Sequence, residues 1–143
     1  MSEAELSVDL SLSGSTKERI LHTAARLFSE RGFDNVSLRD ITTAAGANIA
    51  AVNYHFGSKV SLLTEVFEEY AAPVNIARMK LLDECAHRET NDAPKVAEVL
   101  WALIYPAFHA PDGGVKGEHF RRMLGRLSAS SNPDVRRILF NTF

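Results

Sequence analysis

The sequence predicts an all-α protein, with an N-terminal three-helix helix-turn-helix domain followed by a partial helical domain. Apolar residues recur at helical spacing through most of the chain, and capping residues and Gly or Pro breaks divide it into short segments. No stretch alternates polar and apolar residues between hairpin signals. The expected parts are a mobile tail over 1–15, the three-helix domain over 16–58 and the second helical domain over 59–143.

The first helix is expected over 16–31. Ser15 followed by Glu18 has the spacing of a capping box, and Gly32 follows the last apolar turn as a C-cap. One stripe of this helix is apolar and is expected to be buried: Ile20, Leu21, Ala24, Ala25, Leu27 and Phe28.

Two short helices joined by a glycine come next. Ser37 is the expected N-cap of the second helix, Gly46 breaks it, and Asn48 caps a third helix that ends at Phe56-Gly57. Two short helices that cross steeply need apolar residues where they touch and a glycine where the backbone turns. The expected contact residues are Ile41, Ala45, Ala47, Val52 and Phe56.

The rest of the chain is also predicted to be helical. Ser58 caps a fourth helix beginning at Lys59, and Pro73 is expected to kink or break it near 70–73 before it resumes to about His87. Further helices are expected from Asp92 and Pro94 to about Phe108, over 116–128, and from Pro133. The chain stops inside an apolar helical pattern, so the second domain is expected to be incomplete.

Composition excludes several classes of protein. The chain has 143 residues, 45% of them hydrophobic, which is a globular composition. No apolar run approaches the roughly 20 residues that span a bilayer, and no secretory signal is present. Cys85 is the only cysteine and cannot form an internal disulfide. A cytoplasmic protein without a membrane partner is therefore expected.

The net charge of −2 is unevenly distributed. Residues 1–15 carry −3, residues 16–59 carry +2 and residues 60–143 carry −1. The only positive block is thus the one that contains the helix-turn-helix. This small excess permits a nucleic-acid partner but does not by itself indicate one.

The third helix has the residues of a groove-reading element. With Val52 and Phe56 facing inward, small and polar residues remain on its outer face. Small residues let a helix enter the DNA major groove, and asparagine can bond bidentately to an adenine edge. The outer face consists of Asn48, Ala50, Ala51, Asn53 and Tyr54. Taken alone, Tyr54 and His55 would be interpreted as capping a small three-helix core, and the surrounding helix-turn-helix pattern reverses that interpretation.

The same segment resembles the DNA-binding domain of the TetR family of bacterial transcriptional repressors. The likeness lies in T-K-E-R-I-L-H-T-A-A-R-L-F-S-E-R-G-F, S-L-R-D-I and Y-H-F-G-S-K, covers about 16–70, and is greatest to a branch that includes regulators of fatty-acid metabolism. It implies contacts to the DNA backbone from Ser37, Tyr54, His55 and Lys59. It implies base readout from Arg39, Asn48, Ile49, Ala50, Ala51 and Asn53.

Three positions need comment. Thr42 stands where the family usually has alanine, and Asn53 where it usually has an aromatic residue. Periodicity groups Ile49 with the core, whereas the resemblance exposes it to DNA. We follow the resemblance, because Ala47 and Phe56 already fill the contact between the two helices.

Other chemistry has little support. No nucleotide-binding, hydrolase or metalloprotease motif is present, so neither an enzyme nor a cofactor is expected. Asp83, Glu84 and His87 lie on neighbouring turns but lack the second Glu-x-x-His of a di-metal bundle, so no metal is expected. Apolar residues of the later helices are more often core than pocket, but six of them are candidates to line an apolar ligand cavity: Trp101, Tyr105, Phe108, Phe120, Met123 and Leu127.

Two functions remain. The first is a homodimeric repressor that binds double-stranded operator DNA and is released by a small apolar or acyl-type effector. The second is a helical bundle that binds a small molecule or a protein partner without binding DNA.

Overall fold

The computed structural model describes residues 14–88, 92–109 and 115–142, so most of the predicted tail lies outside the described residues. Within those ranges all regular structure is helical, which confirms the all-α class. The helices are α2 (Thr16–Arg31), α3 (Leu38–Ala45), α4 (Ile49–His55), α5 (Lys59–Ala86), α6 (Val96–Phe108), α7 (Val115–Ser128) and α8 (Pro133–Thr142).

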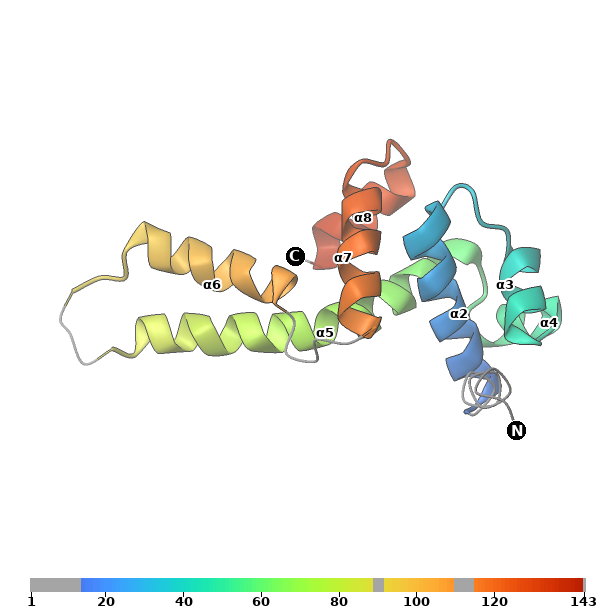
Figure 1. Ribbon diagram of the computed structural model, residues 1–143, viewed down its shortest axis with the longest axis horizontal. Coiled ribbons are helices and arrows are strands. Elements are labelled where there is room, and N and C mark those ends of the chain that lie inside the picture. The colour runs from blue at the N-terminus through green and yellow to red at the C-terminus, as the bar shows by residue number, and fades with distance from the viewer. Residues whose placement is uncertain (1–13, 89–91, 110–114, 143) are drawn as a thin grey trace.

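The long helix α5 is the element around which the others are arranged (Figure 1). Helices α2, α3 and α4 gather at its N-terminal end, and α6 runs beside its C-terminal half. Helix α7 packs against both α2 and α5, and α8 packs against α5 and α7. Because α5 and α7 contact elements on both sides, the helix-turn-helix domain and the following helices share one body.

The starts of α2 and α5 lie at the predicted N-caps. The Ser15 hydroxyl accepts the Glu18 N–H at 3.2 Å, and the Ser58 hydroxyl accepts the Ser61 N–H at 3.0 Å. These side chains satisfy amide groups that the first helical turn leaves without partners. The predicted helix over 16–31 and the predicted start of the fourth helix at Lys59 are confirmed.

A single apolar cluster runs through the molecule. It contains residues from every helix, and its largest fully buried members include Ile20, Phe28, Ile41, Val52, Leu62, Phe67, Phe120 and Met123. Among the described residues of α6, only Ala107 belongs to it. The helix-turn-helix is therefore held by the same core as α7 and α8, whereas α6 is attached mainly through α5.

Of the expected kink or break at Pro73, the break is wrong, because α5 continues through the proline. Proline removes one N–H, so the Glu69 carbonyl loses its helical partner. Glu69 is an exposed residue, which lets water replace the missing donor. Tyr70 and Val74 are buried against the core and hold the helix on both sides of the proline.

The start of α6 also differs from the prediction. It begins at Val96 rather than at Asp92 and Pro94. The Glu98 carboxylate accepts the Lys95 backbone N–H at 3.0 Å, which places the N-cap at Lys95. Within the part of the chain that the structure describes, no helix is long and apolar enough to cross a membrane.

Candidate nucleic-acid interface

The turn between α3 and α4 depends on Gly46. Its backbone lies in the left-handed region, with φ 63° and ψ 38°. A side chain is unfavourable there, and glycine avoids that cost. The Ala47 N–H donates to the Thr42 carbonyl at 2.9 Å and closes the turn. The predicted helix, glycine turn and helix are present.

Thr42 is accommodated inside this turn. It is 5% exposed, and its hydroxyl donates to the Arg39 carbonyl at 3.1 Å. Because this buried hydroxyl has a hydrogen-bond partner, it avoids the desolvation cost that an unpaired polar group would carry. Threonine can therefore occupy this position without disturbing the angle between the helices.

Helix α4 has a buried back and an exposed front. Val52 is fully buried and Phe56 is 7% exposed, as the sequence predicted. Ile49 is 41% exposed and Tyr54 is 86% exposed, and Ala50 and Asn53 are exposed as well. Ile49 thus lies on the outer side, which settles its orientation in favour of the resemblance. Ala51 packs partly against the core and lies at the edge of the front.

The side-chain oxygen of Asn48 caps the start of α4. Its Oδ1 accepts the Ala51 N–H at 2.8 Å, the expected N-cap bond. A bidentate adenine contact uses the carbonyl oxygen and the amide together. Asn48 therefore retains its amide N–H groups for a single contact, whereas Asn53 on the exposed face is better placed for a bidentate one.

Ser37 and Asp40 cap α3 reciprocally. The Ser37 hydroxyl accepts the Asp40 N–H at 3.0 Å, and the Asp40 carboxylate accepts the Ser37 N–H at 2.9 Å. The hydrogen bond from the Ser37 backbone holds the pKa of Asp40 below its ordinary value. The hydroxyl proton of Ser37 can still be donated to a phosphate, and Arg39 is exposed beside it.

Lys59 is half-buried and packs on an aromatic ring. Its ammonium lies 4.2 Å from the centroid of Phe33. Burial lowers the pKa of Lys59, against the opposite effect of Asp34 and Asp40. The predicted phosphate contact is therefore also part of the packing at the start of α5. Tyr54 and His55 lie close by in sequence, with ring centroids 5.0 Å apart.

Two basic residues that support the interface were not predicted. Arg19 donates from Nε to the Ala45 carbonyl at 3.3 Å and so links α2 to the end of α3. Lys17 pairs with Glu65 at 3.3 Å and lies 5.7 Å from the Phe56 ring centroid. Cations are unfavourable at the start of a helix. Two basic residues in the first turn of α2 therefore indicated that these side chains have partners elsewhere in the fold.

The six residues predicted to line a ligand cavity are not brought together. Trp101 and Phe108 are 61% and 60% exposed, and Tyr105 is half-buried. The other three are buried in the core, because the apolar stripe of α7 faces α2 and α5: Phe120, Met123 and Leu127. The predicted cavity is therefore wrong as a single site.

The cluster over 83–87 is explained locally. His87 Nδ1 lies 3.0 Å from the Asp83 carbonyl within the last turn of α5. Over the described ranges, no group of three or more His, Cys, Asp or Glu side chains is placed to hold a metal ion.

Two short helices joined by a left-handed glycine, with the second anchored behind and exposed in front, define a helix-turn-helix domain of the kind that reads DNA. The family model described as "Bacterial regulatory proteins, tetR family" matches residues 20–66. Residues 20–66 of this chain are therefore similar to the DNA-binding part of TetR-family regulators.

Curated relatives also match only part of this chain. The transcriptional regulator AcrR of Shigella flexneri is 38% identical over 66 residues, which is 46% of this chain and 30% of the relative. The transcriptional repressor NicS of Pseudomonas putida is 36% identical over 74 residues, which is 52% of this chain and 35% of the relative. These matches span about a third of the relatives' length.

The crystal structure of the TetR-family regulator PfmR from Thermus thermophilus superposes with a TM-score of 0.55 at 27% identity. The match covers 89% of this chain and 63% of that one. The likeness therefore extends beyond the helix-turn-helix into the helices that follow it.

Proposed function

We propose that the chain is a sequence-specific DNA-binding transcription regulator whose helix α4 enters the major groove. The observation that carries this proposal is the division of α4 into two sides. Val52 and Phe56 anchor it from behind, while Ile49, Asn53 and Tyr54 are exposed in front. An exposed helix with small residues and an asparagine suits a groove that presents hydrogen-bonding base edges and thymine methyl groups.

The residues assigned to the DNA contact divide into two roles. Base readout is assigned to Asn53, Ile49, Ala50 and Arg39, with Ala51 at the edge and Asn48 limited to donation. Phosphate contacts are assigned to Ser37, Tyr54, His55 and Lys59.

We further propose that the protein is a homodimeric repressor released by a small apolar or acyl-type effector. A dimer that places two α4 helices in successive major grooves needs half-sites about 34 Å apart. Helix α5 contacts α2 at one end and α6 at the other, so a change near α6 can tilt α5 and alter that separation. Comparison of the Tyr54-to-Tyr54 spacing in free and effector-bound dimers tests this; an unchanged spacing contradicts it. Membership of the branch of fatty-acid-metabolism regulators stays a prediction.

The experiment that tests DNA binding is selection of duplexes from a random pool, followed by a salt series on the selected sequence. A protein that neutralises phosphates loses affinity linearly in log salt, because bound counterions are released. We expect a steep negative slope. A helical bundle that only binds a small molecule or a protein partner would show no duplex binding even at low salt.

A further inference from the structure

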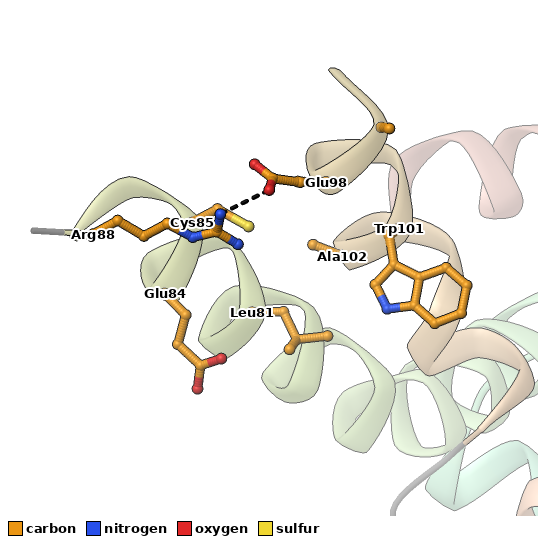
Figure 2. A pocket seen from close by; sticks show the side chains of 8 residues that line it. Leu81, Glu84, Cys85, Arg88, Glu98, Trp101 and Ala102 are labelled. Atoms are coloured by element: carbon orange, nitrogen blue, oxygen red, sulfur yellow. Dashed lines mark hydrogen bonds and ion pairs between the residues drawn. The ribbon is translucent and has the colours of Figure 1, made fainter. Parts of the chain in front are cut away.

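A groove of about 270 Å³ lies between the C-terminal end of α5 and the first turns of α6. Figure 2 shows Leu81 and Cys85 on α5 facing Ala102 and Trp101 on α6. Ala97 completes the α6 side. The lining is predominantly apolar and includes the only tryptophan and the only cysteine of the chain.

One end of the groove carries charged groups, two of which form an ion pair. Arg88 pairs with Glu98 at 2.7 Å, drawn as the dashed line in Figure 2. The hydrogen bond from Arg88, supplemented by the Lys95 N–H, holds the pKa of Glu98 below its ordinary value, so this carboxylate stays ionised at neutral pH. Glu84 also lines the groove, and Lys95 lies near Glu98. The lining itself holds two carboxylates and one guanidinium that is already paired, so the groove offers no excess positive charge for an anionic ligand.

Arg88 supplies further hydrogen-bond donors at this end of the groove. A guanidinium has five N–H donors, and the pair with Glu98 is a single contact through one nitrogen. A hydrogen-bond acceptor on a ligand can therefore meet the remaining donors. An apolar groove with a few convergent polar groups is the ordinary form of a small-molecule site, and its volume of about 270 Å³ limits it to a small ligand.

We propose that this groove binds a small, planar, uncharged aromatic molecule whose hydrogen-bond acceptor meets Arg88 and whose ring contacts Trp101. An indole contacts a planar ring favourably in stacked or edge-on geometry. The site rests on the proposed function, since it supplies the effector-binding part of it. It differs from the predicted cavity, because Phe120, Met123 and Leu127 take no part.

The probe is the neutral naphthalene ketone Prodan, with binding followed by quenching of Trp101 fluorescence. We expect saturable binding of one dye per chain. Ala97→Leu fills the groove from an exposed position, and the dissociation constant should rise at least tenfold. Val96→Leu is the matched control, because Val96 is 75% exposed and does not line the groove. Bound Prodan should also slow alkylation of Cys85 by iodoacetamide several-fold.

Four results overturn the proposal. The first two are the absence of saturable Prodan binding and an equal dissociation constant in the wild type and Ala97→Leu. The other two are an equal loss of Prodan affinity in Ala97→Leu and Val96→Leu, and unchanged alkylation of Cys85 at saturating dye. Tighter groove binding of the anionic dye anilinonaphthalenesulfonate would contradict the uncharged ligand class.

Duplex binding by the same proteins separates this proposal from the function on which it rests. The groove lies at the opposite end of α5 from α4 (Figure 1), so Ala97→Leu should bind DNA like the wild type. A protein that binds Prodan in the groove but no duplex contradicts the DNA-binding proposal alone.

Discussion

Gly46 shows how one residue sets the angle at which α4 is presented. Its φ of 63° disfavours any side chain. We expect Gly46→Ala to lower the free energy of unfolding by about 1–2 kcal/mol, because an L-residue pays this cost in the left-handed region. Urea denaturation measures the change.

Gly125 supplies the control for that substitution. It lies inside α7, and a Cβ built there has no atom within 4 Å beyond its immediate surroundings. Gly125→Ala should stabilise the protein by up to about 1 kcal/mol through helix propensity. Equal effects of the two substitutions would show that the turn does not depend on the backbone of Gly46.

Asn53 and Lys59 are assigned different roles, which their variants should separate. Asn53→Ala should change the selected duplex sequence and cost about 1–3 kcal/mol at the base it contacts. Lys59→Met keeps the stem on Phe33 and removes the charge, so it should weaken all duplexes alike and reduce the salt slope by about one. An unchanged selected sequence for Asn53→Ala would show that this residue does not read a base.

The Asp40 cap gives a pH-dependent contribution to stability. Because hydrogen bonding lowers its pKa in the folded protein, the contribution is complete above the ordinary value of 3.8 and is lost as the pH falls through the lowered value. Thermal melts from pH 6 to pH 2.5 should show a smaller loss below pH 4 for Asp40→Asn than for the wild type. Asp92→Asn, at an exposed aspartate outside the helices, should leave the loss unchanged.

The residue roles could be predicted where they follow from local spacing. Val52 and Phe56 are one helical turn apart, so their shared buried side was readable from the sequence. The half-burial of Lys59 was not, because its aromatic partner Phe33 is separated from it by two helices. The use of Asn48 Oδ1 as a cap was predicted, but its competition with base readout became clear only from the geometry.

Among the elements, α2 and α7 are joined by a specific hydrogen bond. Arg126 Nε donates to the Ser29 carbonyl at 2.9 Å, and Asn132 donates to Asp34 at 2.8 Å just beyond it. Arg126→Met should lower the free energy of unfolding by about 1–2 kcal/mol, because Ser29 is 1% exposed and its carbonyl loses a charged donor.

Arg122 is the matched control on the same helix. It pairs at 2.7 Å with Glu118, one turn away, and both side chains are largely exposed. Arg122→Met should change the free energy of unfolding by no more than about 0.5 kcal/mol, because exposed ion pairs contribute little to stability. If Arg126→Met has an effect this small, the bond does not couple the two helices.

Helix existence was readable from caps and periodicity, but two element boundaries were not. Proline usually ends a helix, yet burial of Tyr70 and Val74 on either side keeps α5 continuous. The start of α6 depends on Glu98, whose carboxylate caps Lys95 and pairs with Arg88, just beyond the end of α5. Both outcomes depend on contacts between elements, which a local pattern does not contain.

At the scale of the whole molecule, stability is distributed unevenly. The apolar cluster joins α2 to α5, α7 and α8, whereas within 96–108 only Ala107 belongs to it. We expect α6 to open before the rest, because regions with few buried contacts unfold at lower free energy. Trp101 fluorescence should therefore change at a urea concentration about 1 M below the circular-dichroism midpoint. Coincident transitions would show that α6 unfolds with the core.

The uninterrupted course of α5 has a mechanical consequence. At 1.5 Å per residue, its 28 residues form a lever about 42 Å long. A rotation of about 3° about one end of a helix this long displaces the other end by about 2 Å. In the proposed mechanism, a small movement of α5 at its α6 end would reposition α4, while the chemistry of the reading face stays intact.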